Sequence, residues 1–156
     1  MTLTYQIEVR ALTDRYTAVV RRELPREELA GWLGEAFQAV HGYLRRNGVD
    51  PVGPPFARYT FLGDTVAVEA GFPVPHEVAG SGPVQPSTLP DGQAAVTTRV
   101  GPYEDLDKAY LAVRIWLDTR GYLPAGPHWE VYHTDPTTEP DSTRWRTDLV
   151  VPYRVP

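Results

Sequence analysis

The chain contains an internal repeat, and this repeat restricts the available folds more than any other feature of the sequence. A shift of 73 residues (106 − 33) places residues of the first half on similar residues of the second: Leu33 on Leu106, Ala36 on Ala109, Phe37 on Tyr110, Val40 on Val113, Leu44 on Leu117, Gly48 on Gly121, Phe56 on Trp129 and Tyr59 on Tyr132. Near the end of each half the shift becomes 79 (152 − 73), which places Pro73 on Pro152 and Glu69 on Asp148. We interpret the chain as two copies of one unit.

Each copy has the hydrophobic periodicity of a β-α-β-β unit. The helix of the first copy opens at Pro25, carries apolar residues at spacings of three and four, and ends before Gly48. Its strands are expected at 16–24, 56–62 and 66–74, and the second copy has strands at 93–100, 126–134 and 145–153 around a helix at 103–120. An extra strand at 5–12 is expected to join 16–24 through a short turn, and the Pro-, Gly- and Ser-rich stretch 75–90 to cross the surface between the copies.

Two such units predict an α+β fold in a single domain spanning 1–156, with repeat halves at about 5–74 and 92–154. In this fold the β-α-β-β units are related by pseudo-twofold symmetry and share one curved antiparallel sheet. Two amphipathic helices bury their apolar stripes on one face of that sheet. The other face is then available for a ligand cleft.

Composition restricts the partners. The net charge is −5 with no cluster of Lys or Arg, which argues against direct binding of nucleic acid through its phosphates. The chain has no cysteine, no signal-peptide pattern and no apolar run of membrane-spanning length, so no membrane association and a cytoplasmic location are expected.

The segment GPHWEVYHTD at 126–135 alternates as a strand, with His128, Glu130 and Tyr132 on one face and Trp129 on the other. If both faces are covered, Glu130 lies in a dry place, where an unpaired carboxylate is costly and usually holds something. The alternative is a strand glutamate that faces water.

The same alternation distributes the remaining candidates. We expect Phe56 and Trp129 to face the helices, which turns Tyr59, Glu130 and Tyr132 to the cleft. The neighbouring strands present the apolar residues Val66, Val68, Ala70, Phe72, Leu149 and Val151 to the helices. Glu69 and Asp148 are therefore also assigned to the cleft, with a solvated sheet face as the alternative.

Other chemistries lack support in the sequence. His128 and His133 lie on opposite faces of one strand, so no metal site is expected. No acyl-transfer, nucleotide-hydrolysis or dinucleotide motif is present, and no cofactor is expected.

Five motifs, in order, resemble the gyrase-inhibitor-like (GyrI-like) family, which shares its SHS2-like repeat fold with the AraC-type effector-binding domain. They are FARY at 56–59, VEAGFPV at 68–74, VGPYEDL at 100–106, WEVYHTDP at 129–136 and RTDLVVPYR at 146–154. The resemblance covers nearly the whole chain and implies a cleft between the halves that binds drugs or effectors. It places Glu130 at the pocket centre against cationic aromatic ligands, with Tyr59, Tyr103 and Tyr132 stacking on them. No residues outside the repeat remain for a DNA-binding domain, so a stand-alone binder is implied.

Three functions follow from these observations. The first is binding of a bulky aromatic or cationic small molecule of the multidrug type, in which Glu130, Tyr132, Tyr59, Tyr103, Glu69 and Asp148 contact the ligand. The second, which the resemblance suggests, is a hydrolase of cyclopropane-containing DNA-alkylating natural products, with Glu130 and Tyr132 as catalytic groups. The third is a protein inhibitor of a topoisomerase.

Overall fold

The computed structural model describes residues 5–102, 106–135 and 138–156, which form two compact units. The N-terminal unit is Thr13–Asp91, and the C-terminal unit combines Met1–Leu12 with Gly92–Pro156.

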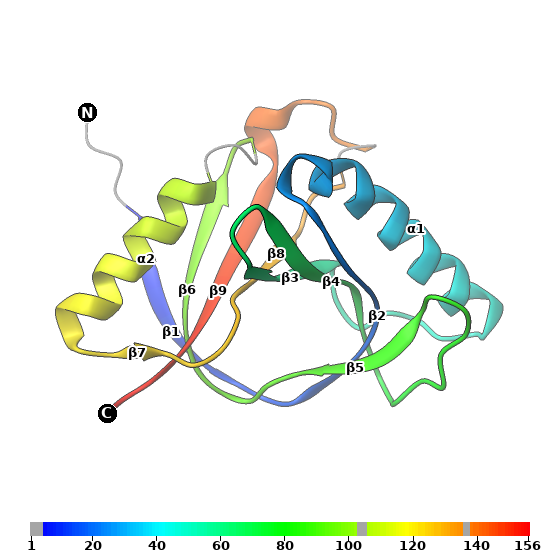
Figure 1. Ribbon diagram of the computed structural model, residues 1–156, viewed down its shortest axis with the longest axis horizontal. Helices are drawn as coiled ribbons and strands as arrows, with labels where there is room; N and C mark the ends of the chain where they lie inside the picture. The colour runs from blue at the N-terminus through cyan, green and yellow to red at the C-terminus, as the bar shows by residue number, and fades with distance from the viewer. Residues whose placement is uncertain (1–4, 103–105, 136–137) are drawn as a thin grey trace. The chain divides into compact units, whose positions relative to one another are not determined.

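The N-terminal unit consists of one helix and four antiparallel strands in the order β3-β4-β2-β5 (Figure 1). Its elements are β2 (Arg15–Pro25), a 3-10 turn (Arg26–Glu28), α1 (Leu29–Arg46), β3 (Phe56–Phe61), β4 (Thr65–Val74) and β5 (Gln85–Leu89). The predicted β-α-β-β order is present. Strand β5 was not predicted, because Pro86 and the surrounding Gly and Ser residues indicated a loop. It pairs with β2 at the edge of the ladder, where a proline is tolerated.

The C-terminal unit has the same plan, with strand order β1-β6-β9-β8. Its elements are β1 (Ile7–Leu12), β6 (Gly92–Val100), α2 (Leu106–Arg120), the two-residue β7 (Leu123–Pro124) beside β9, β8 (Trp129–Tyr132), a 3-10 turn (Ser142–Arg144) and β9 (Arg146–Arg154). The two expected strands at the start of the chain are present and joined by a short turn, but β1 pairs with β6 rather than with β2. Strands β1 and β5 have equivalent roles, because each pairs with the strand that precedes its unit's helix.

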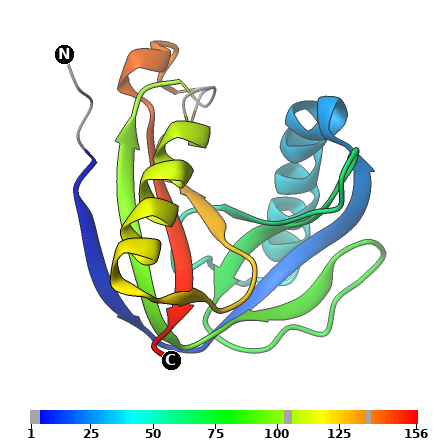
Figure 2. The same cartoon turned by 60° about the vertical axis from the view of Figure 1, so that its left-hand side comes forward.

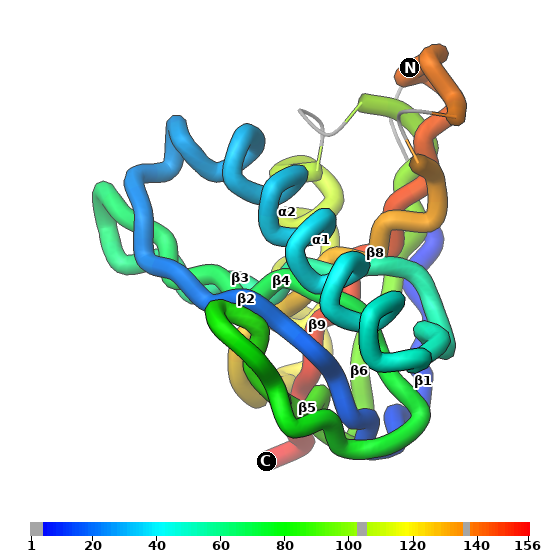
Figure 3. The backbone as a smooth tube through the Cα atoms, turned by 90° about the vertical axis from the view of Figure 1, so that its right-hand side faces the viewer, coloured from blue at the N-terminus to red at the C-terminus, as the bar shows by residue number. Residues whose placement is uncertain are grey.

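Each helix packs on the equivalent face of its own ladder. In the N-terminal unit α1 lies over β2 and β4 (Figure 3), and the ring of Phe37 meets that of Phe72 edge-on at 6.2 Å. In the C-terminal unit α2 shares one buried core with β6 and β9, made of Ala95, Ala109, Val113, Leu117, Leu149, Val151 and Tyr153. The shift of 79 places Phe72 on Val151, so equivalent positions of the repeat pack against the helix in both units. These contacts confirm the α+β fold and the predicted inward orientation of Phe72, Leu149 and Val151.

Both helices end in the same way. Gly48 and Gly121 have φ values of 66° and 71°, as predicted. The amide of Val49 donates to the carbonyl of Leu44 at 3.0 Å, and that of Tyr122 donates to Leu117 at 3.0 Å. These six-residue closures are Schellman motifs, and the 73-residue shift relates them to each other.

Alanine at Gly48 or at Gly121 is expected to lower the free energy of unfolding by about 1 kcal/mol. A Cβ at either position meets no atom within 4 Å, so the cost comes from the left-handed backbone alone. Gly34→Ala is the matched control, because this exposed glycine in the middle of α1 is also open to a Cβ but has ordinary helical backbone. The Gly34→Ala variant should have a free energy of unfolding higher by roughly 0.5–1 kcal/mol. Urea unfolding followed by circular dichroism measures all three, and equal effects at the three positions would contradict the analysis.

Candidate functional site

Glu130 and Tyr132 lie on the face of β8 that is directed toward α2. The register pairs Glu130 with Leu149 and Tyr132 with Thr147, and residues directly opposite in an antiparallel ladder share a face. Leu149 belongs to the core that α2 covers. The Tyr132 hydroxyl donates a 2.7 Å hydrogen bond to Oε1 of Glu130. Tyr132 is buried and Glu130 is half-buried, so the phenol holds a carboxylate that keeps some access to solvent.

His128 precedes this pair on the same face. Its ring lies against that of Tyr110 on α2, with 4.7 Å between the ring centroids. The imidazole is 9% exposed, and this burial lowers the pKa of His128 from 6.5 to about 4. The side chain is therefore neutral at pH 7. The alternation of the strand had placed His128 on the face of Glu130, but His128 was considered for a role only as a metal ligand, and its contact with Tyr110 was not predicted.

Thr147 adds a buried hydroxyl next to the pair. It is 1% exposed and lies directly across from Tyr132 in the ladder. Its Oγ1 has no hydrogen-bond partner among the described residues. An unsatisfied buried hydroxyl costs free energy, so it is a ready donor or acceptor for a molecule that reaches it. Sequence reasoning missed Thr147, because its place depends on the register between β8 and β9.

The expected orientation of the aromatic residues is wrong. Trp129 pairs with Val150, and Phe56 pairs with Gly71, so both lie on the face away from the helix of their unit. Tyr59 pairs with Val68 and so faces the α1 side of its ladder, where its ring stacks on Phe61 at 6.1 Å. In each unit the helix-directed face therefore carries these candidates, Tyr59 in one and Glu130 with Tyr132 in the other, and their assignment to the opposite face is corrected.

Asp148 does not share the face of Glu130. It is 4% exposed, pairs with Val131 and faces away from α2. Thr98 donates to its Oδ1 at 2.6 Å, Nε2 of His133 lies 2.8 Å from its Oδ2, and a guanidinium nitrogen of Arg10 lies 3.7 Å away. Burial alone would raise the pKa of Asp148, but these hydrogen bonds and charges outweigh it and hold the pKa below its usual value. This carboxylate stabilises its own ladder.

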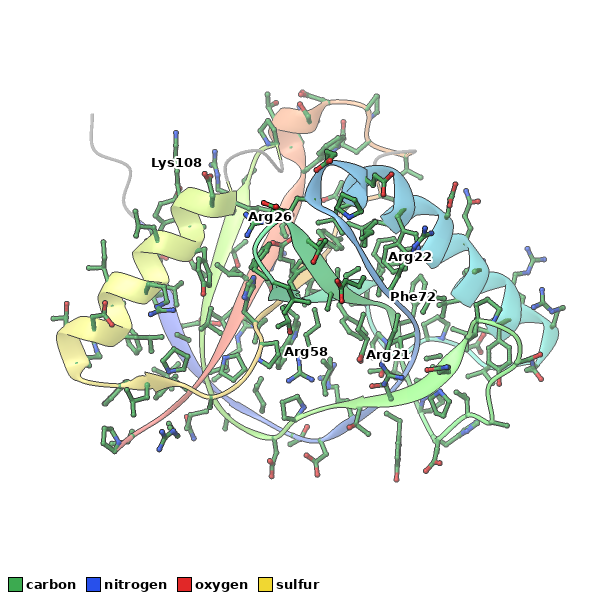
Figure 4. All side chains as sticks on the ribbon, viewed as in Figure 1. Arg21, Arg22, Arg26, Arg58, Phe72 and Lys108 are labelled. Carbon is green, nitrogen blue, oxygen red and sulfur yellow. The ribbon has the colours of Figure 1, made fainter. Side chains whose placement is uncertain are left out.

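Glu69 has the equivalent setting in the N-terminal unit. It pairs with Arg21 on β2 and with Arg58 on β3, two arginines labelled in Figure 4. Nε of Arg21 donates to Glu69 at 3.0 Å, and the Ser87 hydroxyl donates at 2.7 Å. Burial lowers the pKa of Arg58, and the charge of Glu69 partly offsets that effect. Glu69 faces away from Tyr59, so these two residues do not share a site.

Three further observations complete the description. Tyr103, also predicted to contact a ligand, lies outside the described residues. Within the described part of the chain, no three His, Asp or Glu side chains are grouped as metal ligands. Neither helix, over its described length, is long and apolar enough to cross a membrane.

The buried His128 predicts a loss of stability in mild acid. In the unfolded chain the His128 imidazole binds a proton with a pKa of 6.5, whereas in the folded chain it does so only at about pH 4. The contribution of the neutral His128 to stability is therefore complete above pH 6.5 and is lost as the pH falls from 6.5 to about 4. The full loss is about 3 kcal/mol. His128→Gln, which cannot titrate, should flatten the profile of melting temperature against pH in this window. His76→Gln changes an exposed histidine and should leave the profile unchanged, and matching profiles for all three proteins would contradict the assignment.

Comparison with solved structures supports the fold. The crystal structure of the EcmrR C-terminal domain is 20% identical in sequence and has a TM-score of 0.82, covering 97% of this chain and 99% of that one. The cryo-EM structure of the EcmrR–DNA complex in EcmrR-RPo has a TM-score of 0.84 at 20% identity. It covers 96% of this chain but 57% of that chain, so the chain spans little more than half of this relative.

A third structure, that of SAV2435 bound to tetraphenylphosphonium, is 15% identical with a TM-score of 0.67, covering 97% of this chain and 94% of that one. No curated protein matches the chain significantly. The family described as the GyrI-like small molecule binding domain matches residues 5–154, which is nearly the entire sequence. The chain therefore belongs to the GyrI-like family of small-molecule-binding domains.

Proposed function

We propose that this GyrI-like domain binds bulky aromatic, cationic small molecules, with Glu130 as the charge that attracts them. The observation that carries the proposal is the 2.7 Å hydrogen bond from Tyr132 to Glu130 on the helix-directed face of β8. A neutral phenol orients the carboxylate without cancelling its negative charge. Glu69 and Asp148, which each accept a hydroxyl donor and contact an arginine, lie instead on the face that is directed away from the helix of their unit.

The surroundings of Glu130 favour an aromatic cation over a small inorganic one. Attraction between a carboxylate and a cation is stronger where apolar groups lower the local dielectric, and Leu149 and the α2 core provide such surroundings. The Tyr132 ring adds an aromatic surface, for which a cation–π contact contributes roughly 0.5–2 kcal/mol. The tetraphenylphosphonium bound to SAV2435, a fold relative, is a bulky aromatic cation, which supports this choice of ligand class.

Titration with tetraphenylphosphonium tests the proposal. Glu130→Gln preserves the shape of the side chain and removes its charge, so affinity should fall by roughly 1–3 kcal/mol, or about 5- to 150-fold. Affinity for the neutral triphenylphosphine oxide should fall much less on the same substitution. Glu35→Gln removes one negative charge from the exposed side of α1 and is the matched control, with affinity unchanged. Isothermal calorimetry measures each pair, and equal affinity of wild type and Glu130→Gln for the cation would refute the role of Glu130.

Tyr132→Phe separates the hydroxyl from the ring. Loss of the hydrogen bond should loosen the carboxylate and cost roughly 0.5–1.5 kcal/mol of cation binding, while the ring contact remains.

Mass analysis of an electrophilic natural-product ligand after incubation tests the hydrolytic alternative. Ligand returned unchanged indicates a binding protein, whereas turnover that Glu130→Gln abolishes without loss of affinity indicates a hydrolase in which the same pair moves a proton.

A further inference from the structure

Strand β1 lies at the edge of its ladder, and one of its sides is not paired with any described strand. Among the described strands it pairs only with β6, in a six-residue register from Ile7 opposite Thr97 to Leu12 opposite Gly92 (Figure 2). The edge strand β5 of the N-terminal unit is shorter and contains Pro86, which has no amide hydrogen to donate. Strand β1 contains no proline or glycine, so its outer backbone groups are available to a further strand.

The side chains of β1 are arranged so that two antiparallel copies of this strand would present complementary residues to each other. Val9 lies at the centre of the strand and is 50% exposed. Glu8 and Arg10 lie on either side of it, both largely exposed, and share the opposite face of the strand. A side-chain contact between these two residues, together with Asp148 at 3.7 Å from Arg10, orients the guanidinium along that face.

In an antiparallel pairing of two β1 strands about Val9, each of these side chains lies opposite a compatible residue of the second copy. Positions whose numbers sum to 18 then lie opposite each other, so Val9 meets Val9 of the second copy and Ile7 meets Ala11. On the other face Glu8 meets Arg10 of the second copy, and Arg10 meets its Glu8. Charged residues on an edge strand normally discourage pairing, but in this register each of them lies directly across from the opposite charge, which is favourable.

We propose that β1 is a homodimerisation edge at which two copies of the chain pair antiparallel about Val9. Such an interface is isologous, as expected for a twofold dimer. It buries one strand edge per copy and so belongs to the small, weak class of interfaces, which predicts a concentration-dependent dimer. Because two ion pairs contribute, the dimer should weaken as salt is added.

Sedimentation equilibrium from about 1 µM to about 1 mM tests the proposal on the intact chain. Glu8→Arg places a guanidinium directly opposite Arg10 of the second copy and should weaken the dimer at least tenfold. Glu27→Arg makes the same charge change on an exposed residue of the 3-10 turn before α1 and should have no effect. A wild-type chain that stays monomeric over this range, or a dimer that both variants affect equally, would overturn the proposal.

A mixing experiment makes the test specific for pairing across β1. Arg10→Glu should also be monomeric, because Glu8 then faces a second carboxylate. An equimolar mixture of Glu8→Arg and Arg10→Glu should form heterodimers, since both cross-strand pairs regain opposite charges. Circular dichroism confirms that each variant is folded. If Arg10→Glu is unfolded through its contact with Asp148, Arg10→Gln replaces it and should restore part of the association with Glu8→Arg. Folded variants that fail to associate when mixed would count against β1 as the interface.

Discussion

The register of the antiparallel ladders determines the chemistry of this domain. A strand has only two faces, and the residue directly opposite in the neighbouring strand decides which other side chains share each face. The pairing of Glu130 with Leu149 directs this carboxylate toward α2, and the pairing of Val131 with Asp148 directs the second carboxylate away from it. A slip of one residue between β8 and β9 would exchange the two. The position of the candidate site thus depends on one set of backbone hydrogen bonds.

The three acidic residues show how a folded chain accommodates carboxylates at the borders of its core. Asp148 and Glu69 lie at equivalent positions of the repeat, and each accepts a hydrogen bond from a hydroxyl and contacts an arginine. These contacts compensate the loss of solvent that burial imposes. Glu130 has a different setting, in which Tyr132 orients the carboxylate on the helix side. The face of the ladder on which each acid lies separates the two acids that stabilise a ladder from the acid proposed to meet a ligand.

Membership in a family of small-molecule-binding domains agrees with the distinction between Glu130, proposed to meet a ligand, and the ladder-stabilising acids Glu69 and Asp148. The buried surface of α2 against β6 and β9 provides a rigid support, while the half-buried Glu130 at its margin retains access for a ligand. The neutral His128 against Tyr110 extends the aromatic surroundings of that margin without adding positive charge at pH 7. The proposed dimer edge at β1 lies elsewhere in the ladder order, with β6 and β9 between it and β8.

The sequence by itself determined the local elements and their duplication. The helix stripes, the glycine ends of both helices and the alternation within β8 follow from spacing, because each depends on residues a few positions apart. Tertiary structure decided which strands pair and which faces combine. Local sequence patterns predicted neither the pairing of β1 with β6 nor the strand β5 around Pro86. Phe56 and Trp129 were assigned to the wrong face because apolar size predicts burial but not direction, and each of these strands has buried residues on both faces. The grouping of Thr147 with Glu130 and Tyr132 likewise follows from hydrogen bonds between strands far apart in the chain, which no local pattern specifies.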